Sequence, residues 1–518
     1  MAQPILTAQE MQALDRWAID DEGVPSLTLM ESAGRAIANS VARSYPEAHR
    51  VLAIVGKGNN GGDGLVVARL LREQGLEARV WMIPPEEEVS GNAEVNLHRA
   101  KKSGVPILAA DHELPSLEEE LAAADLVIDA VFGTGLRGAP RGAAEAAIGA
   151  IRQSGRPVLA VDGPSGVEGD TGRAGGEYVR ADLTVALAHL KVGHLMHPGR
   201  SLAGEIEVAD IGIPKRGAPS FPRRYRIEEG DLRDRWPGRP ADCHKGSVGR
   251  LLVLAGSRGM LGAACLAAEA AMRTGAGYVV LAAPSGAIDI LAGKLLEVVL
   301  RPLPQTENGV LCPTAASEAI ELANRTDAVA IGPGLGAADG FLQAFFESRP
   351  AIPCVIDADG LRAIDHVSLH AKLDLLTPHA GELGRILGKP REEIEADLLG
   401  AANEARAKVG ATVLLKGSPT LVCGPTGELF ISDTGNPAMA TAGCGDVLTG
   451  VIGALLAAGV EATAAAWMGA WLHGRAGDRA AVRLGNGLLA RDVTDAIPAA
   501  MREITAGMRQ PPGEIGGQ

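Results

Sequence analysis

Short apolar runs alternate with longer helix-like segments along most of the chain. In the first half the apolar runs are RVLAIVG (50–56), ARVWMI (78–83), DLVIDAVFG (125–133), PVLAVDGP (157–164) and DLTVALA (182–188). In the second half they are RLLVLAGS (250–257), YVVLAAP (278–284), DAVAIGPG (327–334), PCVIDADG (353–360), DLLTPH (374–379) and TVLLKG (412–417). Apolar strands separated by helices are typical of a parallel sheet with helices on both faces. The pattern therefore predicts an α/β fold.

The alternation stops between Pro214 and Pro240, where five prolines stand among dense charges. A chain of 518 residues is too long for a single core, so this stretch is the expected domain connection. We expect one domain over residues 1–225 and a second over residues 226–510. The first helix is expected to begin after Thr7, because Thr7 and Glu10 match a capping box.

The charge and the cysteine content narrow the class of protein. A net charge of −14 argues against a nucleic-acid-binding protein, which usually presents a basic face. The N-terminal sequence has no signal-peptide pattern, and Gly459 and Glu461 interrupt the most apolar segment, so no membrane span is expected. None of the six cysteines forms a C-x-x-C pair. We expect a cytoplasmic homo-oligomer whose partners are small-molecule substrates.

A glycine-rich loop, GKGNNGGDG (56–64), follows the first apolar run and precedes a helical pattern. Gly56, Gly58 and Gly61 match G-x-G-x-x-G, a spacing that lets a backbone approach a phosphate group at a helix start. A dinucleotide-dependent dehydrogenase would also need an acid at the end of the second strand. That strand ends in WMIPP, with Glu86 beyond two prolines, which weakens the hydride-transfer interpretation.

Polar residues follow further strands of the first half, where α/β folds bind ligands. Asp129 and Asp162 stand at the ends of two runs, and Ser165 follows Asp162 closely. These residues and Asn60 form a set in which Asn60, Asp129 and Ser165 offer hard oxygen ligands for a cation. Taken singly, Asn60 and Ser165 are as easily turn formers and Asp129 a helix cap. The combination favours a site.

The motifs NNGGDG, DAVFGTGLRG and VDGPSG, in this order, resemble the epimerase domain of the NAD(P)H-hydrate repair enzymes over residues 1–225. The resemblance implies a Rossmann-like three-layer αβα domain in which a potassium ion is held by Asn60, Asp129 and Ser165. It also implies that Asp162 faces the reacting ring, where a carboxylate would stabilise a cationic ring and shuttle protons. The implied hydrate contacts are Asn59, Asn60, Gly61, Gly62 and Asp63, and the implied phosphate contacts are Gly133, Thr134, Gly135, Leu136, Arg137, Gly138 and Ala139.

A second glycine loop, TAGCGDVLTG (441–450), lies in the other half of the chain. No G-x-x-x-x-G-K-[ST] motif occurs, so the loop is not a P-loop. Backbone N–H groups around Gly443, Cys444 and Gly445 would face a transferring phosphoryl group, and Asp446 would take a proton from an acceptor hydroxyl. A simple glycine turn with Asp446 as a helix cap is the alternative. Cys444 has no histidine arranged with it and is interpreted as a small loop residue.

The motifs TPHAGE, LLKGSPT and GNPAMAT resemble the ribokinase-like fold. In that fold an N-x-x-E glutamate orders magnesium-bound water, a role that would fall to Glu382, with His379 in place of the asparagine. The histidine, HKGSVGRLLVLAGS and GPGLG together resemble the nucleotide-dependent NAD(P)H-hydrate dehydratases over residues 230–505.

That resemblance implies ADP, rather than ATP, as the co-substrate. The implied nucleotide contacts are Lys416, Gly417, Ser418, Pro419, Thr420 and Gly445, and the implied hydrate contacts are Ala263, Gly334, His379 and Asp446, with Asp446 as the base. Ala438 and Ala442 stand where the family often has glycine, and Ala442 would be strained if its φ were positive.

Two other functions remain open from the sequence. The second domain shares its fold with small-alcohol and hydroxymethylpyrimidine-type kinases. The first domain could be a non-catalytic module that binds RNA or protein. A repair pathway explains why one chain carries both loops: one domain interconverts the two epimers of hydrated NADH or NADPH, and the other removes water from the S epimer.

Overall fold

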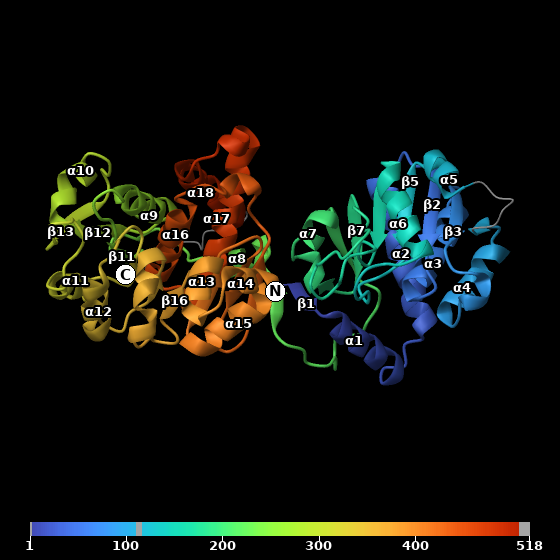
Figure 1. Cartoon of the computed structure of the whole chain (residues 1–518), viewed down its shortest axis with the longest axis horizontal. Coiled ribbons are helices and arrows are strands. Elements are labelled where there is room, and N and C mark those ends of the chain that lie inside the picture. The colour runs from blue at the N-terminus through green and yellow to red at the C-terminus, as the bar shows by residue number, and fades with distance from the viewer. Residues whose placement is uncertain (1–2, 110–115, 507–518) are drawn as a thin grey trace, which may run out of the picture. The chain divides into compact units, whose positions relative to one another are not determined.

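The computed structural model describes residues 3–109 and 116–506, which divide between Pro222 and Arg223 into two compact units (Figure 1). The domain bounds 1–225 and 226–510 remain a prediction, and residues 507–510 lie outside the described part of the chain. Each unit is built around its own sheet, and each is described by itself below.

The sheet of the first unit is parallel throughout, in the order β4-β3-β2-β5-β6-β7-β9. The strands are β2 (Arg50–Val55), β3 (Glu77–Met82), β4 (Ile107–Ala109), β5 (Leu126–Ala130), β6 (Val158–Val161), β7 (Leu183–Leu187) and β9 (Glu205–Ala209). Strands β1 (Gln3–Leu6) and β8 (Leu190–Lys191) form a short parallel pair outside this sheet. From β2 the chain adds β3 and β4 on one side, and from β5 it adds the later strands on the other side. The carboxyl ends of β2 and β5 therefore mark the position where a ligand is expected.

Helices cover both faces of this sheet. Val51, Ala53 and Val55 of β2 pack into one core with α2, α3 and α4, while Leu52 and Ile54 pack into the other with α5 and α6. The helices are α1 (Ala8–Asp20), α2 (Ser26–Ser44), α3 (Asn59–Glu73), α4 (Asn92–Lys102), α5 (Leu117–Ala123), α6 (Ala143–Ser154) and α7 (Gly199–Leu202). This is the expected three-layer arrangement.

The sheet of the second unit runs in the order β13-β12-β11-β14-β15-β16-β17-β18-β19-β10. It is parallel from β13 to β17, and β18 is antiparallel to both of its neighbours. The strands are β10 (Arg224–Arg226), β11 (Arg250–Leu254), β12 (Tyr278–Pro284), β13 (Val299–Leu303), β14 (Ala328–Ile331), β15 (Cys354–Ile356), β16 (Asp374–Leu376), β17 (Thr412–Leu415), β18 (Thr420–Cys423) and β19 (Leu429–Ser432).

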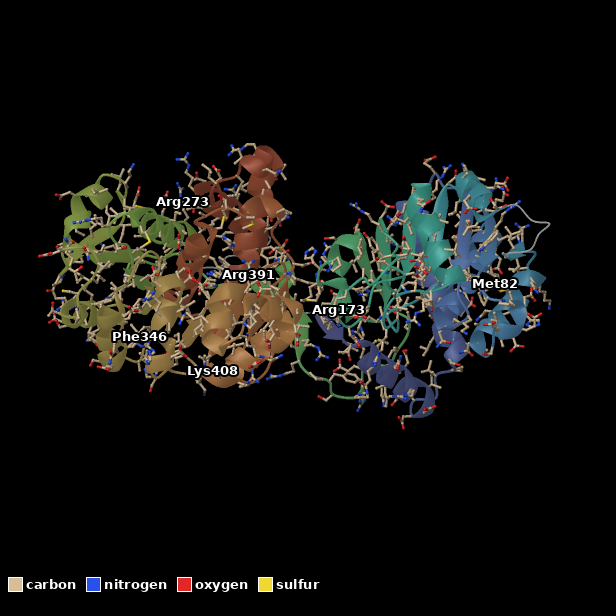
Figure 2. The ribbon with its side chains drawn as sticks, viewed as in Figure 1. Met82, Arg173, Arg273, Phe346, Arg391 and Lys408 are labelled. Atoms are coloured by element: carbon tan, nitrogen blue, oxygen red, sulfur yellow. The ribbon has the colours of Figure 1, made fainter. Side chains whose placement is uncertain are left out.

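The second sheet is also buried on both faces. Leu251 and Val253 of β11 join the core beneath α9, α16, α17 and α18, whereas Leu252 and Leu254 join the core beneath α11 and α12. Phe346 belongs to the latter core and Met82 to a core of the first unit (Figure 2). The helices are α8 (Glu229–Arg233), α9 (Leu261–Thr274), α10 (Ile288–Ala292), α11 (Ala315–Ala323), α12 (Asp339–Ser348), α13 (Ala380–Leu387), α14 (Arg391–Ala396), α15 (Leu398–Val409), α16 (Cys444–Ala457), α17 (Ala462–Leu484) and α18 (Ala490–Thr505).

All eleven apolar runs of the sequence contain strands, and the Thr7 capping box begins α1 as predicted. The expected connection over 214–240 is only partly a linker. Its residues Arg224–Arg226 form β10, which pairs with β19, and Arg226 bonds Asp433 at 2.8 Å. Arg223 and Arg226 of this stretch are therefore partnered within the second unit, and Lys215 pairs with Asp210 of the first. Among the helices of the described residues, none has the length and hydropathy that a membrane crossing needs.

Candidate active sites

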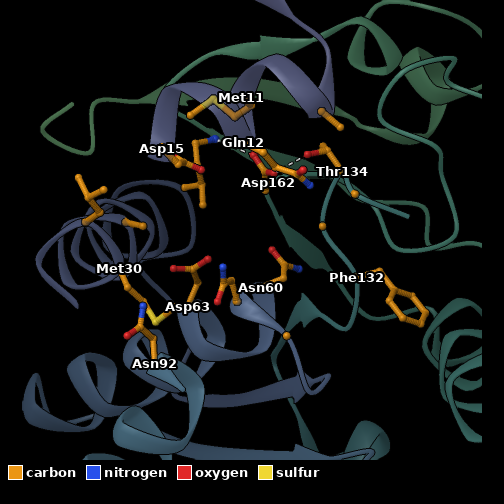
Figure 3. Close-up of a pocket in the computed structure, with 18 of the residues that line it drawn as sticks. Met11, Gln12, Asp15, Met30, Asn60, Asp63, Asn92, Phe132, Thr134 and Asp162 are labelled. Atoms are coloured by element: carbon orange, nitrogen blue, oxygen red, sulfur yellow. Dashed lines mark hydrogen bonds between the residues drawn. The ribbon is translucent and has the colours of Figure 1, made fainter. Parts of the chain in front are cut away.

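A cavity of about 620 Å³ lies in the first unit at the carboxyl ends of β2, β5 and β6 (Figure 3). Among the residues implied by the sequence, those that line it are Asn59, Asn60, Asp63, Gly133, Thr134, Gly135, Leu136, Arg137 and Asp162. Sequence reasoning missed several others, which come from α1, α2, α4 and β8, among them Met11, Gln12, Asp15, Met30, Asn92 and Lys191.

The start of α3 faces this cavity. Gly58 is the N-cap of α3 and makes no side-chain capping bond, and Gly58, Asn59 and Asn60 all line the cavity. A Cβ atom at Gly61 would lie 1.9 Å from the carbonyl oxygen of Gly56, so the loop closes on itself too tightly for any side chain. The backbone amides of a helix start are thus presented to a ligand, where they favour an anion.

Four of the implied hydrate and phosphate contacts do not line the cavity. A Cβ atom at Gly62 would lie 2.8 Å from the Met30 side chain, so Gly62 permits the packing of α3 against α2. The Gly138 amide donates to Glu168 at 3.1 Å, and Ala139 lies against Gly176. Gly61 permits the close approach of the loop to Gly56. The structure accounts for these residues by packing, and their contact with a ligand stays a prediction.

Asp162 lies in the cavity wall with both carboxylate oxygens occupied. Its Oδ1 atom accepts from the Leu187 amide at 3.0 Å and pairs with Lys191, and its Oδ2 atom accepts from Thr134 at 2.8 Å. Burial would raise the pKa of Asp162, but Lys191, His194 and the Leu187 amide together outweigh burial and leave this pKa below its usual range. Asp162 therefore carries a negative charge. Its φ of +64° is an unusual conformation for a residue with a side chain, as found at functional sites.

Lys191 and His194 support Asp162 from the segment after β8. The Lys191 side chain is 1% exposed, and its ammonium also donates to the Leu187 carbonyl at 2.9 Å. The His194 ring contacts the Asp162 carbonyl at 2.7 Å, and burial lowers the pKa of His194 to about 4. The neutral histidine therefore has a structural role.

Two other carboxyl groups line the same cavity, Asp63 on α3 and Asp15 on α1. Burial, with the nearby charges of Asp162 and Asp15, raises the pKa of Asp63 well above its usual value. Burial raises the pKa of Asp15 to about 6. A carboxylic acid that holds its proton, Asp63, thus lies in the same cavity as the ionised carboxylate of Asp162.

Asp129 and Ser165 lie together below the cavity. Ser165 donates its hydroxyl to Asp129 Oδ1 at 2.6 Å and its amide to Asp129 Oδ2 at 2.8 Å. The Phe132 amide donates to the Ser165 hydroxyl at 2.9 Å, and a Cβ atom at the neighbouring Gly133 would lie 3.1 Å from Asn60 Oδ1. Burial raises the pKa of Asp129 to about 6. Asp129 caps no helix in this arrangement.

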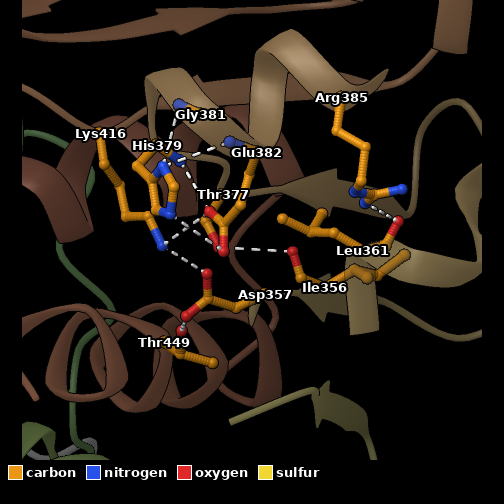
Figure 4. Close-up of polar contacts among 10 residues, drawn as sticks. All are labelled: Ile356, Asp357, Leu361, Thr377, His379, Gly381, Glu382, Arg385, Lys416 and Thr449. Atoms are coloured by element: carbon orange, nitrogen blue, oxygen red, sulfur yellow. Dashed lines mark hydrogen bonds and ion pairs between the residues drawn. The ribbon is translucent and has the colours of Figure 1, made fainter. Parts of the chain in front are cut away.

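The second unit holds a cluster of charged groups at the ends of β15, β16 and β17 (Figure 4). Lys416 Nζ lies 2.6 Å from Asp357 Oδ1 and 3.7 Å from Glu382 Oε2. Thr449 of α16 donates to Asp357 Oδ2 at 2.6 Å. A Cβ atom at Gly445 would lie 3.5 Å from Lys416 Nζ, so the second glycine loop adjoins this cluster.

His379 is the N-cap of α13. Its Nδ1 atom accepts from the Gly381 amide at 3.0 Å and the Glu382 amide at 3.2 Å, while its own amide donates to Glu382 Oε2 at 2.8 Å. Histidine therefore replaces asparagine as a capping residue, and its Nε2 atom lies 3.6 Å from Glu382 Oε1. The His379 side chain is 59% exposed, which leaves it accessible.

Asp446 lies in the first turn of α16 and makes no hydrogen bond or ion pair with the described residues. The N-cap is Gly443, with φ +96°, so Asp446 is not the helix cap. Burial, and next the charge of Asp357, raise the pKa of Asp446 to about 6, against the opposing effect of Lys416. A half-buried carboxylate without a partner is available as a base. Burial also raises the pKa of Cys444 to about 11, so that this thiol is no nucleophile.

Ala263 and Gly334 meet on the other side of the glycine loop. A Cβ atom at Gly334 would lie 3.1 Å from Ala263 Cβ, and one at Gly443 would lie 2.6 Å from Leu266 of the same helix. The helix α9 thus packs both against the 332–336 loop and against the start of α16. Ala442 is not among the residues with positive φ, so it fits its position without strain.

Asp357 and Asp359 were not recognised as candidate site residues, although they lie in DADG at the end of the apolar run 353–360. The rule that selected Asp129 and Asp162, a carboxylate at the end of a parallel strand, would also have found Asp357. Ala358 between them has φ +46°. In the described part of the chain, no three His, Cys, Asp or Glu side chains gather as a metal site would need.

Known families match both units. Residues 251–499 match the family described as NAD(P)H-hydrate dehydratase, and residues 26–193 match the YjeF-related protein N-terminus. A crystal structure of the ADP/ATP-dependent NAD(P)H-hydrate dehydratase from Bacillus subtilis is 30% identical, with a TM-score of 0.47, covering 54% of this chain and 97% of that one.

Relatives of full length are also found. The bifunctional NAD(P)H-hydrate repair enzyme Nnr of Moorella thermoacetica is 41% identical over 96% of this chain and 97% of the relative. The enzyme of the same name from Thermofilum pendens is 38% identical over 96% of each chain. The chain therefore belongs to the family of bifunctional NAD(P)H-hydrate repair enzymes.

Proposed function

We propose that Asp162 and Asp446 serve the two halves of one repair pathway for hydrated NADH and NADPH. The chain is a bifunctional repair enzyme with an epimerase domain at its N-terminus and a nucleotide-dependent dehydratase domain at its C-terminus. The proposal concerns which residues carry each activity. The observation that carries it is Asp446, an unpartnered carboxylate at a helix start, beside a lysine that faces the same glycine loop.

In the epimerase cavity, the amides at the start of α3 and the 133–139 loop hold the hydrate and its phosphates. The ring nitrogen of the hydrate expels the hydroxyl group and becomes part of a cationic ring. Asp162 keeps its negative charge in the wall of the cavity and stabilises that cation. Return of water to the other face of the ring carbon gives the other epimer.

A potassium ion fits the residues below this cavity. The Asn60 Nδ2 atom is buried without a hydrogen-bond partner, and turning the amide would place its oxygen there instead. Asp129 and Ser165 supply two more oxygen ligands of the kind that hard cations prefer. The bound ion would offset the burial of the Asp129 carboxylate and fix the 131–135 loop.

In the dehydratase site, Asp446 takes the proton of the hydrate hydroxyl while its oxygen attacks the terminal phosphorus of the nucleotide. The amides near Gly445 and the Lys416 ammonium stabilise the charge on the transferring group. Phosphate is a better leaving group than hydroxide, so its elimination, with loss of a proton from the neighbouring ring carbon, restores NADH or NADPH. Residues 416–420 hold the nucleotide, and Ala263, Gly334 and His379 hold the hydrate.

ADP is the nucleotide that we propose, on the sequence resemblance to the fused enzymes. Magnesium fits beside Glu382, whose carboxylate is 20% exposed and would hold the ion through water, as is common for this ion. The ion supplies positive charge to the phosphates. All six cysteines are free, which supports the proposed cytoplasmic location, and a homo-oligomer is proposed for solution.

The test uses both epimers of NADH hydrate with magnesium, potassium and ADP, followed by the return of NADH absorbance. Complete conversion of both epimers supports the proposal, whereas conversion of one alone removes the epimerase. A stable phosphorylated product without NADH would favour a small-molecule kinase. Asp162→Asn tests the first site better than alanine, because asparagine tolerates φ +64°. Epimerisation at the wild-type rate would refute that role of Asp162.

A further inference from the structure

Asp15 and Asp63 are the two carboxyl groups of the epimerase cavity whose oxygens are free. Neither makes a hydrogen bond or ion pair with any described residue, although Asp63 is only 6% exposed. Both face the cavity, and Figure 3 shows Asp15 beside Asp162 on one side of it and Asp63 beside Asn60 on the other. A buried polar group without a protein partner is costly unless a ligand satisfies it.

Asp162 is poorly arranged to move protons itself. Its oxygens already accept from Thr134, the Leu187 amide and Lys191. Protonating it would break these bonds and leave the Lys191 ammonium, which is 1% exposed, without a counter-charge. The group that stabilises the cationic ring is thus distinct from the groups that can accept or donate a proton.

We propose that Asp15 and Asp63 are the acid and base of the epimerase, acting on opposite faces of the hydrated ring. This inference rests on the proposed function of the first unit. It assigns proton transfer to these two residues rather than to Asp162, which was the expectation from the sequence. It also gives a role to α1, which no glycine motif pointed to.

The chemistry requires a group on each face. In one direction Asp63 gives its proton to the hydroxyl group, the bond from carbon to oxygen breaks, and water leaves while the ring nitrogen supplies the electron pair. A second water then adds to the same carbon from the other face and gives a proton to the Asp15 carboxylate. The opposite epimer runs the same steps in reverse, and exchange with solvent resets the two carboxyl groups.

The surrounding charges favour a state in which only one of the two carboxyl groups, Asp15 and Asp63, carries a proton. Asp63 faces the carboxylates of Asp162 and Asp15 as well as the Lys191 ammonium, and Asp15 faces Lys191 and Asp162. Burial keeps the pKa of Asp63 well above that of a free carboxyl group, and brings that of Asp15 to about 6. Near neutral pH Asp63 is the acid and Asp15 is the base.

The test follows conversion of pure R hydrate to S hydrate by chromatography, with the full-length protein and without nucleotide. Asp15→Asn and Asp63→Asn should each lower kcat by roughly 10²–10⁴-fold, because each removes one proton-transfer group. Asp20→Asn is the matched control, since Asp20 is exposed on the same helix α1. Thermal unfolding of the first unit reports whether each variant is folded there, and dehydration of S hydrate with ADP reports that the other unit is intact.

The pH profile separates catalysis from a merely structural role. Wild-type kcat/KM should be bell-shaped, with Asp15→Asn losing the acid limb and Asp63→Asn losing the alkaline limb. Retention of the wild-type rate and of both limbs in either variant would overturn the inference. In that event a large loss in Asp162→Asn alone would assign the proton to Asp162. If the wild-type protein itself left R hydrate unchanged, the proposed epimerase function would fail first, so the two failures are distinguishable.

Discussion

Lys416 and Asp357 form an ion pair beside the candidate base of the dehydratase site. Lys416 Nζ lies 2.6 Å from Asp357 Oδ1, and the two side chains are 19% and 1% exposed. The charge of Asp357 raises the pKa of Asp446, and the charge of Lys416 lowers it. The pair therefore ties segment 416–420, the proposed nucleotide-binding segment, to the ionisation of the proposed base Asp446.

Lys416→Met should destabilise the second unit and abolish dehydration. Removing one partner of a buried ion pair costs on the order of 3–5 kcal/mol, because the other charge stays buried. Thermal unfolding should therefore show a lower melting temperature for this unit. Lys372→Met, at an exposed lysine, is the control. An unchanged melting temperature would mean that water replaces the ammonium at no cost.

Asp357→Asn should move the acid limb of the dehydratase pH profile to lower pH. A base must be ionised, so the wild-type rate should fall roughly tenfold per pH unit below the pKa of Asp446, about 6. Asparagine removes the negative charge that raises this pKa and leaves Lys416 to lower it further. Both effects act in one direction. A limb that stayed in place, or moved to higher pH, would show that Asp446 is not the titrating group.

Asp446→Asn should lose activity and gain stability. Loss of the general base should lower the dehydratase kcat roughly 10²–10⁴-fold with little change in KM. Because burial raises the pKa of Asp446 above its unfolded value, the ionised carboxylate weakens the fold at neutral pH. The melting temperature should therefore rise in the variant. A fall in both activity and melting temperature would indicate a structural role instead.

Much of this architecture could be predicted from the sequence. Central strands such as β2 and β11 are buried on both faces, so every position after the first arginine is apolar and the run is easily recognised. Two of the strands that were missed, β10 (Arg224–Arg226) and β9 (Glu205–Ala209), carry charged side chains that pair with neighbours such as Asp433 and Arg43. These two strands are polar because their charged side chains have partners in other elements, and the local sequence does not show those partners.

The site was predicted where one loop supplies several residues in sequence, and missed where single residues arrive from distant elements. NNGGDG and GTGLRG carry Asn60 and Thr134 to the cavity as parts of motifs. Asp15 and Lys191 arrive from α1 and β8, and nothing in their own neighbourhood marks them. Only the packing of the described residues reveals that Lys191 pairs with Asp162.

Lys191→Met should destabilise the first unit most at neutral pH. Lys191 holds the pKa of Asp162 below its usual range, so the pair stabilises the fold at neutral pH, and this contribution is lost as the pH falls through the folded pKa. We expect a loss of about 3–5 kcal/mol because the Asp162 carboxylate stays buried without its counter-charge. Lys191→Met combined with Asp162→Asn should recover part of it, because no unpaired charge is then buried. A double variant no more stable than Lys191→Met would mean that packing, not charge, governs the effect.

Potassium should stabilise the first unit specifically. A ligand that binds only the folded protein at about 100 times its Kd adds about 2.7 kcal/mol. Thermal unfolding in potassium chloride, against choline chloride at equal ionic strength, measures this without an activity assay. Asn60→Ala removes the side chain whose buried amide has no partner and should abolish the difference. Asn92→Ala, at a residue that lines the same cavity and accepts a hydrogen bond from Ser26, should retain it. An equal effect of both salts on the wild-type protein would leave Asp129 and Ser165 as a hydrogen-bonded pair that needs no ion.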